Sequence, residues 1–264
     1  MTTTADRTIA ALRSGHDDLA GALDDLTPTQ LAGPSGASEW SIAQVLSHLG
    51  SGAEIGLAAL EAALNGEPRP GGEFNQSVWD RWNAMDAVEQ AESFVKADEA
   101  LVTRYEGLDE WQRTDLRVDL GFLPAPVDVA TVAGFRLNEL TLHTWDVAVA
   151  FDPTAVLAPD AVELLLDIAP KMFGWLGRPG EILDGRTVKV AVEITDPTGA
   201  FGLVIADGAT LSDTPDNADG TLNLPAESWL RLVSGRLAEP NTPSGVVATG
   251  AVSLPQLRQI FPGY

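Results

Sequence analysis

The sequence predicts an α plus α+β protein in which a four-helix bundle precedes a smaller unit of helices and strands. Three observations lead to this prediction. Helical periodicity fills most of the first 150 residues, the pattern changes after Pro153, and alternating apolar residues typical of a strand begin at Val188. The chain of 264 residues is long enough for one large domain or two small ones. We expect domains at residues 1–155 and 156–264.

The first half contains four helical stretches separated by glycines and prolines. The second stretch has the clearest start, because Ser41 and Gln44 have the S-x-x-Q spacing of a capping box. Apolar residues follow at the i, i+3, i+4, i+7 positions of one helix face, from Ile42 to Leu49. A loop rich in glycine and proline follows at residues 66–72. We expect the four helices at residues 7–25, 41–64, 85–107 and 128–150.

The second half mixes helical and strand patterns. Apolar residues alternate from Val188 to Ile194, turn residues follow in the segment Asp196-Pro-Thr-Gly199, and a second apolar run follows the turn. This order is typical of a β-hairpin. We expect helices at residues 158–176 and 226–238, hairpin strands at 188–194 and 201–206, and a further strand at 245–254.

Composition excludes several classes of function. The chain has 38 acidic and 16 basic residues, a formal charge of −22, which disfavours nucleic acid and anionic membranes as partners. It has no cysteine, so disulfides, thiolate metal sites and a cysteine nucleophile are excluded, and any thiol chemistry would need a small-molecule thiol. Neither a signal-peptide pattern nor an apolar run of about 18 residues occurs, so we expect a cytoplasmic protein.

The fourth predicted helix carries a polar stripe. At about 100° per residue, Arg136, Glu139, His143 and Asp146 fall within an arc of roughly 80° on an otherwise mostly apolar helix. Glu139 and His143 are four residues apart and can donate an oxygen and a nitrogen to one cation. The alternative is a solvated face with an ordinary i, i+4 pair, since this spacing also occurs by chance.

His48 favours the metal interpretation. It lies on the flank of the apolar face of the second helix, where a bundle could turn it toward the fourth helix. Taken alone, His48 fits a hydrogen-bonded core histidine. Together with Glu139 and His143, it gives the His/Glu/His composition of a catalytic zinc site with one position left open.

These motifs resemble a known family. The segment Trp40-Ser-Ile-Ala-Gln-Val-Leu-Ser-His48-Leu, followed about 90 residues later by Glu139-x-x-x-His143-x-x-Asp146, is similar to the mycothiol-dependent maleylpyruvate isomerase family. The segment Leu230-Arg-Leu-Val-Ser-Gly-Arg236 extends the resemblance into the second half. It implies an N-terminal DinB-like four-helix bundle followed by a small α/β domain similar in shape to sterol carrier proteins.

The resemblance also implies a function. His48, Glu139 and His143 would hold a divalent metal, usually zinc, and mycothiol would bind at the open position. The expected protein is an enzyme that adds this thiol to a small electrophilic substrate, as a cis–trans isomerase or as a thiol S-transferase, and the sequence does not separate the two. Two alternatives stay open: a hydrolase that uses metal-bound hydroxide, and a non-catalytic protein that binds a small molecule.

Three further candidates concern catalysis. Arg236, and with less support Arg231, could bind a substrate carboxylate through a bidentate guanidinium fork, although a surface arginine near a helix end is an equally good interpretation. Asp146 could orient a metal-binding histidine, or it could be an exposed carboxylate.

Three candidates concern thiol binding. Asn75, Arg81 and Asn83 follow the second helix, in the region where members of the family place their thiol-binding groups. The remaining histidine, His16, is expected to be a surface residue of the first helix.

Overall fold

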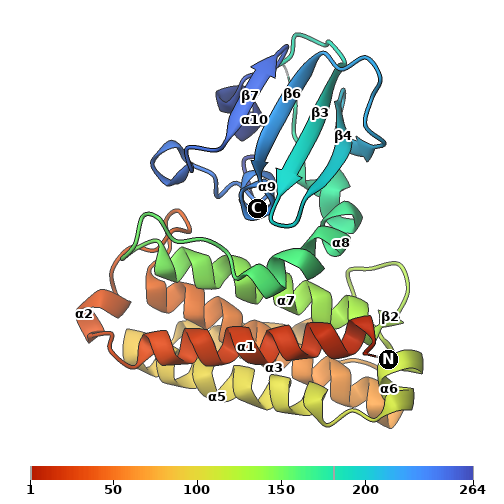
Figure 1. Ribbon diagram of the computed structural model, residues 1–264. Coiled ribbons are helices and arrows are strands. Elements are labelled where there is room, and N and C mark those ends of the chain that lie inside the picture. Colours follow the sequence, from red (N-terminus) through yellow and green to blue (C-terminus); the bar gives the residue numbers. More distant parts are fainter. Residues whose placement is uncertain (1, 181, 264) are drawn as a thin grey trace. The chain divides into compact units, whose positions relative to one another are not determined.

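The computed structural model describes residues 2–180 and 182–263, and its contacts divide the chain into two compact units, Met1–Phe151 and Asp152–Tyr264. The first unit is almost entirely helical and the second contains a mixed sheet with helices (Figure 1). The predicted α plus α+β class is therefore confirmed. No described helix has the length and apolar character needed to cross a membrane.

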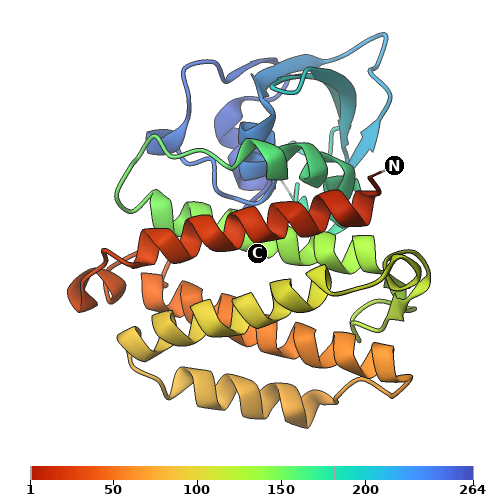
Figure 2. The ribbon, with the colours of Figure 1, turned by 60° about the horizontal axis from the view of Figure 1, so that its bottom comes forward.

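Four long helices form the body of the first unit (Figure 2). Helix α3 packs against α5, and α1 packs against α7, while contacts of α1 with α5 and of α3 with α7 join the two pairs. All four correspond to predicted helices. Their bounds are α1 Thr4–Leu23, α3 Ile42–Asn65, α5 Ala87–Glu106 and α7 Val129–Ala148.

The predicted capping box starts α3. The Ser41 hydroxyl accepts a hydrogen bond from the Gln44 backbone N–H at 3.1 Å, and the Gln44 side-chain oxygen accepts one from the Ser41 N–H at 2.8 Å. These bonds satisfy two backbone donors that a helix start leaves open. Leu46 and Leu49 are completely buried, which fixes the rotation of the helix in the bundle and turns His48 toward α7.

Several short elements of the first unit were not predicted. Helix α4 begins at a Gly-Gly pair, and its N-cap residue, Gly71, makes no side-chain capping bond. Only Val78 and Trp82 of α4 are buried, so neither a cap nor a broad apolar face marks this helix in the sequence. The elements are α2 Pro28–Leu31, α4 Gly72–Asn83, α6 Glu110–Asp115, β1 Arg117–Val118 and β2 Val127–Asp128.

The second unit is built on a five-stranded sheet of order β5-β4-β3-β6-β7, in which β3 and β6 are parallel and the other neighbours antiparallel. The alternating valines of β3 are buried, and α9 packs against β3 and β6. The elements are α8 Pro159–Leu176, β3 Val188–Thr195, β4 Gly199–Ile205, β5 Ala209–Ser212, β6 Gly220–Pro225, α9 Ala226–Val233, η1 Glu239–Asn241, β7 Val247–Gly250 and α10 Leu254–Ile260.

Two predicted elements of the second unit are shorter than expected. The helix predicted at residues 226–238 ends at Val233, because Gly235 adopts a φ of 76° that cannot continue a helix. The strand predicted at 245–254 ends at Gly250, since Ser253 caps the following helix α10. The predicted hairpin of β3 and β4 is confirmed.

Candidate metal centre

The predicted ligand set comes together at one point between α3 and α7. His48 comes from α3, while Glu139 and His143 come from adjacent turns of α7, and one ligand atom of each lies within 4.8 Å of the others. Glu139 Oε2 lies 3.0 Å from His48 Nε2 and 3.7 Å from His143 Nε2. Two imidazoles therefore face one carboxylate oxygen.

The surroundings of Glu139 keep its carboxyl group charged. Burial by itself would raise the pKa of Glu139, but the hydrogen bond from His48 and the positive charges of His143 and His48 outweigh it and lower the pKa to about 2. His143 is buried, whereas His48 is 41% exposed, so the site opens to solvent on the His48 side. The cluster thus offers an ionised ligand at neutral pH and a route for a ligand to enter.

Asp146 supports His143 from behind. Its carboxylate is completely buried and lies 2.8 Å from Nδ1 of His143, so the alternative of an exposed carboxylate is wrong. When Nδ1–H donates to this carboxylate, the Nε2 lone pair of His143 points to Glu139 and His48, as metal-binding histidines require. Two imidazoles, an ionised carboxylate and this supporting acid are a donor set that fits a divalent metal.

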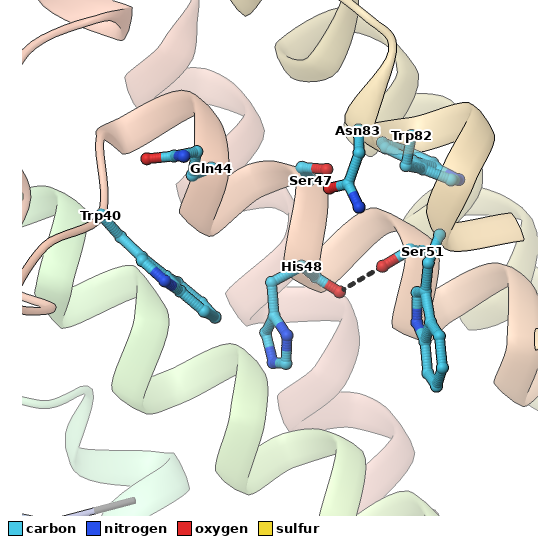
Figure 3. A pocket seen from close by; sticks show the side chains of 8 residues that line it. Trp40, Gln44, Ser47, His48, Ser51, Trp82 and Asn83 are labelled. Atoms are coloured by element: carbon cyan, nitrogen blue, oxygen red, sulfur yellow. Dashed lines mark hydrogen bonds between the residues drawn. The ribbon is translucent and has the colours of Figure 1, made fainter. Parts of the chain in front are cut away.

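A hollow of about 200 Å³ adjoins His48 (Figure 3). It combines aromatic surface with hydroxyl and amide groups, which suits a ligand that has a polar body. Its lining residues are Trp40, Gln44, Ser47, His48, Ser51, Trp79, Trp82 and Asn83.

Comparison with protein families gives a match over residues 12–148 to the model described as the mycothiol maleylpyruvate isomerase N-terminal domain, which spans more than half of the chain. The chain belongs to this family. Two crystal structures, of the mycothiol-dependent maleylpyruvate isomerase and of a histidine-to-alanine mutant of it, align over all of both chains with 14% identity and a TM-score of 0.67. This likeness extends the shared fold to the second unit. A comparison with curated proteins finds no match.

The residues expected to bind thiol in this family are not all brought to the hollow. All three lie on α4, a helix that the sequence did not predict. Asn83, at the end of α4, lines the hollow, whereas Asn75 does not. Arg81 forms a close ion pair with Glu54 of α3 and lines a separate groove.

The two candidate arginines of the second unit are both buried, so the alternative of surface residues is wrong. Arg231 is 1% exposed and donates to the Glu227 carboxylate at 2.6 and 2.8 Å and to the Asn241 carbonyl at 2.8 Å. A substrate carboxylate would have to displace Glu227 to reach it. Arg236 donates to the Ser234 carbonyl at 3.1 Å.

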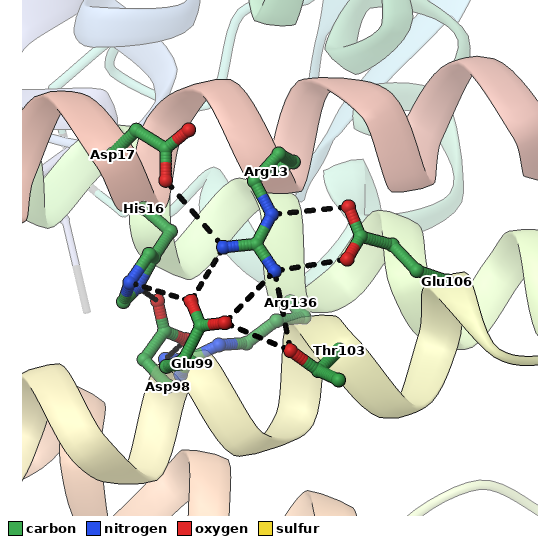
Figure 4. A network of polar contacts seen from close by, with 8 residues as sticks. All are labelled: Arg13, His16, Asp17, Asp98, Glu99, Thr103, Glu106 and Arg136. Carbon is green, nitrogen blue, oxygen red and sulfur yellow. Dashed lines mark hydrogen bonds and ion pairs between the residues drawn. The ribbon is translucent and has the colours of Figure 1, made fainter.

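The fourth member of the predicted stripe turns away from the metal ligands. Arg136 Nη2 donates to Asp98 Oδ1 at 2.6 Å, and Asp98 Oδ2 lies 2.9 Å from Nδ1 of His16 (Figure 4). His16 is therefore buried, and its prediction as a surface residue was wrong. The sequence held a signal for this, because Leu12 and Leu19 place His16 on the apolar face of α1.

Sequence reasoning missed Trp40 as a member of the site. Its ring is nearly parallel to that of His143, at 19° with 6.0 Å between centroids, and lies 5.2 Å from the ring of His48. The available signal was its position directly before Ser41, the N-cap of the helix that carries His48.

Proposed function

We propose that the protein is a metal-dependent enzyme that activates a small thiol, mycothiol, for addition to a small electrophilic substrate. The reaction would be a maleylpyruvate-type cis–trans isomerisation or a thiol S-transfer, and we infer a cytoplasmic location for it. The observation that carries the proposal is the convergence of His48, Glu139 and His143 within 4.8 Å in a chain of this family.

Each residue of the site has a distinct task in this proposal. His48, Glu139 and His143 hold the divalent ion, for which zinc is the best match to two imidazoles and one carboxylate. Asp146 fixes the tautomer and orientation of His143. A bound ion of this kind lowers the pKa of a coordinating thiol from about 8.5 to below neutrality. The chain has no cysteine, so the thiol must come from a small molecule.

The hollow beside His48 provides room for the rest of the thiol. Asn83, Ser47 and Gln44 offer hydrogen bonds to polar groups, and the indoles of Trp40 and Trp79 cover apolar parts of a ligand. Arg81 and Asn75 do not line this hollow, so we assign them no direct contact with the thiol. Arg236 is proposed to bind a substrate carboxylate, since a guanidinium matches that group in a bidentate fork.

The test begins with metal. Purified protein should contain, or take up after chelation, about one zinc per chain, and Glu139→Gln should lower the affinity at least 100-fold, since changes outside the ligand set already cost about 10- to 100-fold. Glu61→Gln is the matched control, because Glu61 also lies on a ligand-bearing helix but pairs with Arg104. A wild-type protein that cannot be loaded with a divalent metal would favour the non-catalytic binding protein.

The second step measures the thiol. Calorimetry of mycothiol binding to the zinc-loaded protein, in buffers of different ionisation enthalpy, should count close to one proton released near pH 7. Binding without proton release would refute thiol activation, and the hydrolase alternative, in which water reacts in place of the thiol, would then replace it.

A further inference from the structure

The segment that precedes α3 is a loop held together by its own hydrogen bonds. The backbone N–H of Ile42 donates to the Gly33 carbonyl at 3.0 Å, and the Ser35 N–H donates to the Trp40 carbonyl at 3.1 Å. The Ser35 hydroxyl adds a bond to the same Trp40 carbonyl at 2.9 Å. Residues 33–41, which we name the anchor loop, therefore have their own internal hydrogen bonds and lead directly into the helix that carries His48.

The middle of the anchor loop is fixed to α7. The Gly36 N–H donates to the backbone carbonyl of Asp146 at 2.7 Å. A Cβ atom at position 36 would lie 2.5 Å from Cγ1 of Val149 and 3.0 Å from Cα of Asp146, so glycine lets the two backbones meet. Asp146 is also the residue whose carboxylate holds His143.

The end of the anchor loop reaches the same histidine from another direction. The indole of Trp40 stacks on the His143 imidazole and also lies against His48. The edge contact between the two imidazoles, with 4.9 Å between centroids, completes a compact group of three rings. The anchor loop thus contacts the ligands of both α3 and α7.

We propose that the anchor loop positions the metal ligands, with Gly36 and Trp40 as its positioning residues. Gly36 fixes the backbone of Asp146, so that the Asp146 carboxylate holds His143 at one angle. Trp40 restricts the rotation of the His143 and His48 rings. Ligand side chains held before the metal arrives lose less freedom on binding, and the bound geometry is better defined. This inference rests on the proposed function, since it takes His48, Glu139 and His143 as the ligands.

Gly36→Ala tests the backbone contact, with Co²⁺ alone as the probe. The added methyl group must displace the loop from Val149 and Asp146. We expect Co²⁺ affinity to fall about 10- to 100-fold, as for other supporting contacts of metal ligands, and the visible spectrum of the bound ion to change. Gly21→Ala is the matched control, because a Cβ there meets nothing within 4 Å, and it should leave both readings unchanged.

Trp40→Ala and Trp40→Phe test the ring contact and do not depend on Gly36→Ala folding. Trp40 is 38% exposed, so its loss removes little core. Trp40→Ala should speed release of Co²⁺ to a chelator and alter its spectrum, and Trp40→Phe should restore most of the wild-type behaviour. Wild-type affinity, release rate and spectrum in both Trp40→Ala and Gly36→Ala would overturn the inference. A wild-type protein that takes up no Co²⁺ would overturn the proposed function instead.

Discussion

Helix α7 takes part in two clusters that look alike in composition and differ in chemistry. The first cluster, which we name the buried network, consists of Asp98, His16 and Arg136. In it, the Asp98 carboxylate accepts hydrogen bonds from both His16 and Arg136. In the candidate metal centre, Glu139 faces two histidines, and among the described residues no lysine or arginine forms an ion pair with it. The protein supplies the cation in the first cluster. In our proposal, the second is completed by a cation from solution.

The two clusters also differ in the solvent exposure of their side chains. Asp98 is completely buried and the His16 side chain is 5% exposed, so no ligand from solution reaches them. Glu139 and His48 are 30% and 41% exposed. A buried carboxylate with a permanent counter-charge holds helices together, whereas a partly open one that faces two histidines can bind and release an ion.

Removing the carboxylate of the buried network should have the largest effect on stability. Asp98→Ala leaves the buried guanidinium of Arg136 without its partner, and breaking such a pair costs about 3–5 kcal/mol. Urea unfolding measures the loss. The exposed Asp17→Ala is the control and should change stability by less than about 0.5 kcal/mol. A small change in Asp98→Ala would mean that the comparison between the clusters is wrong.

The metal centre should show the opposite response. His143→Ala removes one of three ligands, so zinc affinity should fall more than about 100-fold. His16→Ala should lower stability and leave zinc stoichiometry at the wild-type value, because His16 contacts Asp98 rather than the ligands. Metal analysis after dialysis, together with thermal unfolding, separates these responses. Loss of zinc from a folded His16→Ala protein would contradict the separation of the buried network from the metal centre.

Acid should weaken the buried network within a defined range of pH. Burial tends to raise the pKa of Asp98, but the charge of Arg136 and the hydrogen bonds from His16 and Arg136 outweigh it and hold the pKa below its ordinary value. The stabilisation is therefore full above the unfolded pKa of about 3.9 and is lost as pH falls through the lower folded value. The difference in unfolding free energy between wild type and Asp98→Asn should therefore shrink as the pH falls below about 4.

The smallest expected effect lies at the edge of the metal centre. Asn83→Ala removes one hydrogen-bonding group from the hollow and should weaken thiol binding by about 1 kcal/mol, roughly fivefold. Asn75→Ala, on the same helix but outside the lining residues, is the matched control and should bind thiol as the wild type does. Calorimetry of thiol binding to both zinc-loaded variants checks this, and equal losses would place the thiol elsewhere.

Features that depend on residues close together in the sequence, such as the start of α3, could be predicted from sequence patterns. The Ser41–Gln44 capping box and the apolar face behind it located α3, and the four-residue spacing of Glu139 and His143 placed two ligands on one face. That His48 meets them depends on how α3 packs against α7, which periodicity limits but does not fix.

Two of the errors concern partners that are distant in sequence, and the third concerns a helix without a start signal. His16 and Asp98 are 82 residues apart, so the sequence around His16 does not indicate its carboxylate partner. Helical-wheel geometry grouped Arg136 with the proposed ligands because a wheel gives only the angle of a side chain around α7. It does not show which neighbouring helix that side chain contacts, and Arg136 contacts Asp98 of α5. Helix α4 was missed because a glycine pair begins it without a capping side chain.

Two of the three proposed ligands come from one helix, so the cluster can assemble in two stages. Glu139 and His143 meet as soon as this part of α7 becomes helical, whereas His48 joins them only when α3 packs. If these residues are the metal ligands, a partly folded chain with α7 formed would already hold a weak two-ligand site. Ion binding to such a state subtracts from the stabilisation that the native state gains from the metal. Under the proposed function, the net gain would come from the step at which His48 arrives, so a bound metal would stabilise mainly the packing of α3 against α7.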